Sequence, residues 1–300
     1  MTEGRGPATA RVQIAAAALL FSTGGAAIKS TALGSWQVAG LRSAIAFVFL
    51  FAVLPAARRH WSFATLLVGL AYGGTMVLFV TANKLTTAAN AIFLQATAPV
   101  YLLLLAPWLL REPIRRRDLA FMAALAIGLA LFFLGHEAPI ASAPDPALGN
   151  WVALAAGVTW ALTIGGMRWM EKHGEQGSGA ASALAAGNLL AAVACLPMAL
   201  PLAGLTAADG ATLAYLGVVQ IGCAYLFFWH GLKRLPAFEV SLLVLLEPVL
   251  SPLWAWLLQG ERPSAWAGAG GALILVATAV RTLLQGEAVA RDPERPEPAI

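Results

Sequence analysis

One stretch of this chain occurs twice, and that repeat constrains the fold more than any other feature. Residues 81–112 align with residues 230–261 without a gap, at a constant offset of 149 positions. The matches in register are Lys84 with Lys233, Leu94 with Leu243, Pro99-Val100 with Pro248-Val249, and Glu112 with Glu261. Chance matches of Ala and Leu are expected in an apolar chain, but two charges and a proline in register are not. The repeat predicts two structurally related halves.

The composition is that of a membrane protein. Of 300 residues, 59% are hydrophobic and only 11% are charged, against about 25% charged in soluble proteins. Apolar segments of about 20 residues recur along the chain, each able to cross a hydrocarbon core of roughly 30 Å. We predict an all-α integral membrane protein with ten transmembrane helices. The predicted spans are residues 11–31, 36–56, 62–82, 88–110, 118–135, 149–170, 178–201, 210–231, 237–259 and 264–284.

These spans divide into two halves joined by a Pro- and Ala-rich loop. We expect a cytoplasmic N-terminal tail at 1–10, a first five-helix repeat at 11–135, an external linker at 136–148, a second five-helix repeat at 149–284, and a disordered cytoplasmic tail at 285–300. The tail is polar and Pro-rich, as disordered segments are. The apolar run after residue 11 has no convincing cleavage site, so we expect it to be retained as the first helix.

The positively charged residues fix the predicted orientation, because they accumulate on the cytoplasmic side of membrane proteins. With a cytoplasmic N-terminus, 15 of the 19 Lys and Arg residues lie inside. These are Arg5, Arg11, Arg58, Arg59, Arg111, Arg115, Arg116, Arg117, Arg168, Lys172, Lys233, Arg234, Arg281, Arg291 and Arg295. Lys29, Lys84 and Arg262 lie outside, and Arg42 lies within a span. The net charge of +4 therefore reflects membrane orientation and not a nucleic-acid partner.

The two halves are predicted to cross the membrane in opposite directions, because each contains an odd number of spans. Glu112 is then cytoplasmic and Glu261 external, although the repeat makes them equivalent. This 5+5 inverted-topology repeat is typical of secondary transporters, whose substrate site lies between the two repeats.

Three stretches resemble the drug/metabolite transporter superfamily, in its ten-helix subgroup with two EamA-type domains. They are LLFSTGGAAIK, ANKLTTAANAIFLQATAPVYLLLLAPWLLREPI and HGLKRLPAFEVSLLVLLEPVLSPLWAWLLQGERP. The resemblance covers residues 10–284 and is closest to the amino acid and metabolite exporters of the YddG type. It implies a multi-pass transporter of the bacterial inner membrane. The chain departs from the family in having Phe21 where first helices often carry Trp, and the repeat pairs Ala98 with Glu247.

Glu247 is the most distinctive candidate for a functional residue. It lies near the middle of its predicted span, in the run LLVLLEPVL. A carboxylate at the bilayer centre is costly, so it should face a cavity, a partner or a proton. Two interpretations stay open: proton coupling, or a structural acid that binds the backbone freed by Pro248 or pairs with Arg42.

The basic residues near the ends of spans have simpler interpretations. Arg42 lies about 9 Å into its predicted helix at 1.5 Å per residue, within reach of the interface. We expect it to extend to the interface or form a structural pair, ahead of contacting substrate. Lys29, Lys84 and Lys233 are expected to be interfacial anchors at helix ends.

Pro99 and Pro248 occupy equivalent positions in the fourth and ninth spans. A proline inside a helix removes a backbone hydrogen bond and bends the helix. Symmetric bends suit a bundle that opens on one face while it closes on the other. We predict that these prolines are gating hinges, with a static bend as the alternative.

A mostly apolar pocket with a few directed polar groups is predicted from side chains that recur on one helix face. The predicted substrate-binding residues are Ser22, Tyr72, Met76, Phe79, Asn83, Gln95, Trp160, Thr163, Tyr225, Trp229 and His230. Packing or lipid contact is the alternative for each of them.

We expect no cofactor, no metal and no enzymatic activity. The histidines and the two cysteines are scattered, and the spans lack the clustered groups that a membrane enzyme requires. The glycine pairs indicate packing inside the bundle, so the protein is expected to function as a monomer. The expected partners are the lipid bilayer and a small-molecule substrate.

Together these features predict a secondary exporter of small organic metabolites, above all neutral or aromatic amino acids, that works by alternating access. The alternative within transport is a drug or toxic-cation exporter, and outside carriers it is a channel.

Overall fold

The computed structural model describes residues 7–59, 61–109, 116–134, 138–172, 179–202, 204–232 and 234–291. All regular structure in these ranges is helical. Nine helical spans are long and apolar enough to cross a membrane, and Asp118–Leu134 is a shorter apolar helix. The prediction of an all-α membrane protein is confirmed at this level. Glu112 and Lys233, which align in the sequence repeat, lie outside the described residues, as do three of the four scattered histidines, His60, His136 and His173.

Among its described residues, the first predicted half contains seven α-helices. They are α1 (Pro7–Ser22), α2 (Gly24–Lys29), α3 (Ser35–Val53), α4 (Phe63–Leu85), α5 (Ala88–Gln95), α6 (Ala98–Leu109) and α7 (Arg116–Leu134). A short 3-10 turn, Pro55–Arg58, follows α3. Polar caps fix where helices begin: the Ser62 and Thr87 side chains accept hydrogen bonds from backbone N–H groups in the first turns of α4 and α5.

The second predicted half contains α8 (Pro146–Lys172), α9 (Gly179–Ala199), α10 (Ala207–Ala214), α11 (Ala224–Leu232), α12 (Ala237–Val244), α13 (Leu246–Gln259) and α14 (Ala265–Arg291). A π-helical segment, Tyr215–Cys223, joins α10 to α11 in one continuous rod. The capping box of Thr206 and Asp209 begins this rod. Gly260 ends α13 in the left-handed conformation, with φ of 68°.

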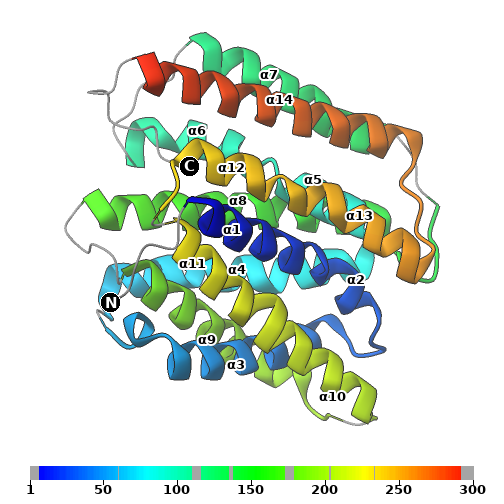
Figure 1. Ribbon diagram of the computed structural model, residues 1–300. Coiled ribbons are helices and arrows are strands. Elements are labelled where there is room, and N and C mark those ends of the chain that lie inside the picture. Colours follow the sequence, from blue (N-terminus) through cyan, green and yellow to red (C-terminus); the bar gives the residue numbers. More distant parts are fainter. Residues whose placement is uncertain are drawn as a thin grey trace.

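The helices pack in a pattern that an exchange of the two halves would reproduce. Helix α4 of the first half packs on α8 of the second half, and the π-helical segment and α11 of the second half pack on α1 of the first half. Likewise α5 and α6 pack on α8, while α12 and α13 pack on α1. The pair α3 and α9 and the pair α7 and α14 join equivalent helices, and α7 and α14 form one edge of the bundle (top of Figure 1).

Small residues allow several of these helices to approach closely. A Cβ atom added to Gly73 of α4 would lie 2.7 Å from the carbonyl oxygen of Gly187 in α9. The same holds at the edge of the bundle, where a Cβ on Gly270 would lie 2.6 Å from the Gly128 oxygen. The predicted role of glycines in packing inside the bundle agrees with these contacts.

Several predicted spans are broken. The span 88–110 divides into α5 and α6 just before Pro99, and the span 237–259 divides into α12 and α13 just before Pro248. The first residues of α5 and α12 lie 149 positions apart, and so do their last residues. This spacing is the offset of the sequence repeat. The first span also breaks, at Thr23, whereas α8 is continuous.

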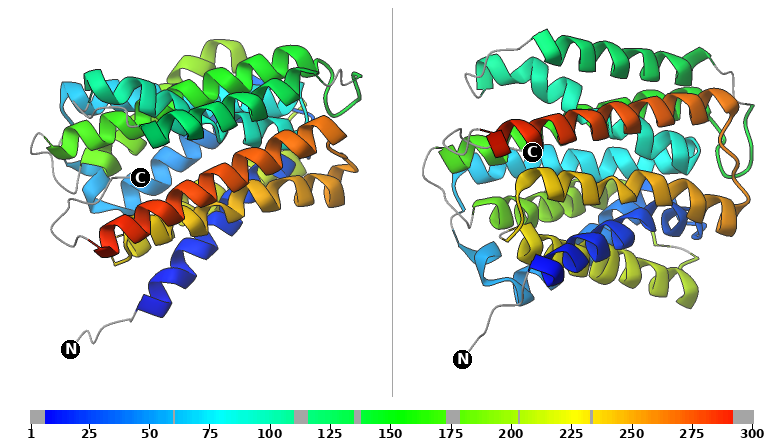
Figure 2. Two further views of the ribbon diagram at one scale, coloured as in Figure 1. Left: turned by 90° about the horizontal axis from the view of Figure 1, so that it is seen from above. Right: turned by 45° about the horizontal axis from the view of Figure 1, so that its top comes forward.

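The two ends of the described chain point the same way. The first turn of α1 and the last turn of α14 lie toward one end of the bundle (left in Figures 1 and 2). This agrees with an even number of crossings, while the side of the membrane stays a prediction. Helix α14 continues to Arg291, past residue 285, where the C-terminal tail was expected to begin.

Candidate functional site

Four aromatic side chains from four helices meet inside the bundle. We call Phe21 of α1, Tyr72 of α4, Trp160 of α8 and Tyr225 of α11 the aromatic cluster. Ring centroids lie 5.0 Å apart for Phe21 and Tyr225, 6.0 Å for Tyr72 and Tyr225, and 6.4 Å for Tyr72 and Trp160. The cluster joins helices of both predicted halves, and it contains three of the predicted site residues.

Arg42 of α3 lies beside the aromatic cluster. Its side chain is buried, with the residue only 1% exposed. Its Nη2 atom donates a hydrogen bond of 3.2 Å to the Met76 carbonyl oxygen and lies 3.5 Å from the Met76 sulfur. The expectation that Arg42 extends to the interface was wrong, because the side chain is buried inside the bundle and bonds to α4.

Glu247 is the second residue of α13, directly after the break between α12 and α13. It is partly accessible although it lies deep in the bundle, within electrostatic range of Tyr225. No ion pair or hydrogen bond to its carboxyl group occurs within the described ranges. The structural interpretation, in which Glu247 pairs with Arg42 or binds freed backbone, therefore finds no support in the contacts.

Ser22 joins α1 to α13 at the break in the first span. It accepts a hydrogen bond of 2.9 Å from the Trp254 indole nitrogen and donates one of 2.7 Å to the Leu19 carbonyl oxygen. Next to it, Thr23 bonds the Tyr215 hydroxyl at 2.8 Å. Ser22 therefore positions α1 against α13, with its polar capacity used inside the protein.

The predicted stripe on α4 divides into two parts. Tyr72 and Met76 lie at the aromatic cluster and Arg42, whereas Phe79 and Asn83 are packed in the core nearer the end of α4. The Asn83 side chain donates to the Phe79 carbonyl oxygen at 2.9 Å, and its oxygen faces Gly25 closely enough that a Cβ there would lie 2.8 Å away.

Two further predicted residues are Thr163 of α8 and Gln95 of α5, which packs on α8. Thr163 is fully buried and donates to the Thr159 carbonyl oxygen at 2.8 Å. Gln95 is half-buried at the end of α5, where its carbonyl oxygen would lie 3.4 Å from a Cβ on Gly157. Neither is among the contacts that form the aromatic cluster.

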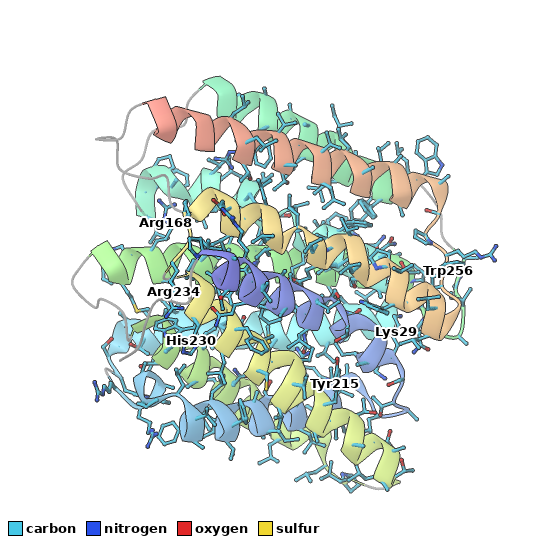
Figure 3. The ribbon with its side chains drawn as sticks, in the orientation of Figure 1. Lys29, Arg168, Tyr215, His230, Arg234 and Trp256 are labelled. Carbon is cyan, nitrogen blue, oxygen red and sulfur yellow. The ribbon has the colours of Figure 1, made fainter. Side chains whose placement is uncertain are left out.

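His230 lies apart from the cluster. It is exposed on α11, with its Nδ1 atom 2.7 Å from the Leu226 carbonyl oxygen. Figure 3 shows it at the same end of the bundle as Arg168 and Arg234. The neighbouring Trp229 is half-buried. The structure thus does not bring His230 into the predicted pocket, because α11 ends close to the surface there.

A polar residue that the sequence analysis missed lies next to the cluster. Gln220 of the π-helical segment is 5% exposed, and its amide nitrogen is 3.4 Å from the Phe21 carbonyl oxygen. The sequence did contain a signal for this residue, because a polar side chain in the middle of an apolar span indicates a function or a buried partner.

A buried ion pair lies at the opposite end of the bundle from His230, which we call the Lys29 end (right in Figure 3). The Lys29 ammonium is 2.8 Å from the Glu261 carboxylate, and each side chain is 2% exposed. Lys29 also donates to the Thr86 and Ser142 carbonyl oxygens, and Glu261 accepts from the Ala88 N–H. The pair joins α2, α5, the linker and the loop after α13, so Lys29 is buried against protein groups at a helix end where an interfacial anchor was expected.

The neighbouring polar groups at the Lys29 end are also paired. Lys84 donates to the Thr31 carbonyl oxygen at 2.6 Å, and the Thr31 hydroxyl donates to Asp209. Within the described ranges, no group of three or more His, Cys, Asp or Glu side chains is arranged to hold a metal ion.

Comparisons with known proteins identify the class. The profile of the EamA-like transporter family matches residues 10–134 and again residues 147–283. The chain belongs to this family of membrane transporters, and the resemblance to the drug/metabolite transporter superfamily is confirmed.

Two curated relatives and a solved structure are similar to the chain. Uncharacterized protein PA1977 of Pseudomonas aeruginosa is 32% identical over 270 residues, which are 84% of this chain and 88% of that protein. Putative permease-like protein YdzE of Bacillus subtilis is 38% identical over 61 residues, 20% of this chain and 78% of that protein. A solved crystal structure of another protein has a TM-score of 0.62 at 22% identity, covering 92% of this chain and 98% of its own. That likeness concerns the fold alone.

Proposed function

We propose that the chain is a secondary transporter that exports neutral and aromatic amino acids, and related small metabolites, across a bacterial inner membrane. The observation that carries this proposal is the aromatic cluster, which is formed by α1, α4, α8 and α11 and is bordered by Arg42 and Glu247. Rings provide apolar contact and offset packing for an aromatic solute. Two charged groups of opposite sign suit a zwitterion better than a simple cation.

Alternating access is the proposed mechanism. The ion pair of Lys29 and Glu261 closes one end of the bundle, which the positive-inside pattern assigns to the external face. The helix breaks before Pro99 and Pro248 supply two bending points at equivalent positions. We infer that the external end opens when this ion pair separates and the helices rotate at these breaks, with both termini in the cytoplasm.

A cation exporter is the second candidate, and Glu247 favours it. An unpaired carboxylate near the Tyr225 ring suits an organic ammonium ion through charge and cation–π attraction. The buried positive charge of Arg42 nearby opposes such a substrate. Glu247 serves the amino acid exporter either as the partner of the substrate ammonium or as the site of a coupled proton.

The test is uptake of labelled solutes into proteoliposomes that contain the purified protein. Neutral, aromatic and cationic solutes are compared, with and without unlabelled solute inside the vesicles, against empty liposomes. We expect saturable uptake of aromatic amino acids that preloading accelerates. Uptake of cations alone would replace the substrate class, and unsaturable flux without acceleration would indicate a channel.

A matched pair of variants connects the flux to the site. Trp160→Ala removes a ring of the aromatic cluster, while Trp108→Ala removes a ring that is 82% exposed on α6. We expect Trp160→Ala to raise the KM for aromatic amino acids and Trp108→Ala to leave it unchanged. Equal effects of the two variants would remove the aromatic cluster from substrate binding.

A further inference from the structure

Arg42 is a buried cation with an incomplete set of partners. Its guanidinium group carries five N–H donors. Within the described ranges, its hydrogen bonds come only from Nη2 and go only to Met76. The Nε atom is buried and donates to no acceptor. Most of the donor capacity of this side chain is therefore unused, although the residue is 1% exposed.

Within the described residues, no carboxylate pairs with this charge. Asp118 pairs with Arg281, Glu239 with Arg11, and Glu261 with Lys29. Glu247, the acid nearest the cluster, forms no ion pair with Arg42 in the described part of the chain. A buried charge without a counter-charge is unfavourable, and a bound anion would remove that cost.

Aromatic rings and hydroxyl donors lie near Arg42. Tyr72 is one helical turn before Met76, which Arg42 binds, and its ring centroid lies 6.0 Å from that of Tyr225. Ser43, the next residue of α3, also has a buried hydroxyl without a hydrogen-bond partner among the described residues. Arginine and tyrosine side chains supply N–H and O–H donors that match carboxylate oxygens, and the fork of the guanidinium binds both oxygens at once.

We propose that Arg42 is the binding site for the substrate carboxylate, and that the ring or alkyl part of the substrate lies against Tyr72 and Tyr225. This proposal rests on the proposed function and names the group that every good substrate shares. A solute that has an ammonium but no carboxylate leaves Arg42 uncompensated, so the site rejects it. Selectivity is therefore set by the anionic end of the substrate, with an amino group second in importance.

Competition on the unaltered protein is the first test, because it does not depend on the folding of a variant. Phenylalanine, phenylpropionate, phenylalanine amide and phenethylamine share a ring but differ in their charged groups. We expect phenylalanine and phenylpropionate to inhibit uptake of labelled phenylalanine. We expect phenylalanine amide and phenethylamine to inhibit it at least about 30-fold more weakly, as for loss of one buried charge-paired hydrogen-bonding group.

The outcomes separate this proposal from the proposed function. Uptake of amino acids with equal inhibition by the amide and the acid would refute the role of Arg42 and leave the amino acid exporter intact. Uptake of phenylpropionate without uptake of amino acids would retain the carboxylate site and refute the substrate class. Uptake restricted to phenethylamine and other cations would overturn both.

Variants give the second test. Arg42→Gln should raise the KM for phenylalanine at least about 30-fold. Arg42→Lys should raise the KM less, because lysine keeps the positive charge but lacks the planar guanidinium that binds both carboxylate oxygens. Arg11→Gln is the control, since Arg11 is exposed and contacts Glu239 away from the aromatic cluster. An Arg42→Gln protein with lowered maximal rate and thermal stability but unchanged KM would show a purely structural arginine and overturn the proposal.

Discussion

The ion pair at the Lys29 end makes the sharpest prediction about stability. Lys29 and Glu261 are each 2% exposed, with a separation of 2.8 Å between charged atoms. Glu261→Gln leaves a buried ammonium without its counter-charge and weakens the acceptor of the Ala88 N–H. Breaking a buried pair in this way costs about 3–5 kcal/mol. At 1.4 kcal/mol for each factor of ten, this is roughly a 10²- to 4 × 10³-fold loss in the folding equilibrium.

Two controls give the prediction its meaning. Replacing both partners, as in Lys29→Met with Glu261→Leu, removes the stranded charge and should recover most of the lost stability, because apolar side chains often replace buried pairs without loss. Glu239→Gln breaks the exposed pair with Arg11, whose side chains are 55% and 24% exposed for Arg11 and Glu239. Solvent screens that pair, so its loss should leave stability almost unchanged.

The assay is thermal unfolding of the purified variants in detergent, followed by uptake in proteoliposomes. Glu261→Gln should unfold at a clearly lower temperature than the unaltered protein, with the double variant between the two and Glu239→Gln at the unaltered value. Equal unfolding temperatures for Glu261→Gln and Glu239→Gln would refute the reasoning. So would a double variant no more stable than Glu261→Gln.

Three other predictions concern the helices and the central acid. Pro99→Ala and Pro248→Ala should slow transport several-fold while substrate binding by the purified protein persists; unchanged rates in both would identify static bends. Gly73→Val should destabilise the protein by at least about 1–3 kcal/mol in an unfolding assay, since a Cβ there meets the Gly187 carbonyl oxygen at 2.7 Å. Glu247→Gln should keep exchange of internal for external substrate but lose acceleration by an imposed proton gradient, and acceleration that persists would exclude Glu247 as the coupled site.

The breaks in the fourth and ninth spans were accessible from the sequence because proline acts locally. The chain therefore divides just before Pro99 and Pro248, at positions the repeat had made equivalent. The break at Thr23 and the π-helical segment Tyr215–Cys223 were not predicted. Tertiary contacts support them, including the bond of Thr23 to Tyr215, and periodicity does not report such contacts.

Burial of charged side chains was the least predictable property. Lys29 is near a helix end, which suggests an interfacial position, yet Glu261 from the other half of the chain removes it from solvent. Arg42 is close enough to a helix end to reach the interface, but neighbouring helices cover it. Of the predicted site residues, Tyr72, Trp160 and Tyr225 lie together in the aromatic cluster. His230 lies apart from them, because a stripe on one helix does not show how far the partner helices extend.

The central claim is that one site at the aromatic cluster is reached from the two sides of the membrane in turn. Labelling of a Met76→Cys protein, with Cys195 and Cys223 replaced by Ala, tests it directly by applying an impermeant maleimide to one side at a time. We expect the maleimide to label the cysteine from one side and not from the other under a given condition. Glu261→Gln should increase labelling from the Lys29 end, and substrate should slow labelling. Equal labelling from both sides, unaffected by substrate or by Glu261→Gln, would describe an open pore and contradict alternating access.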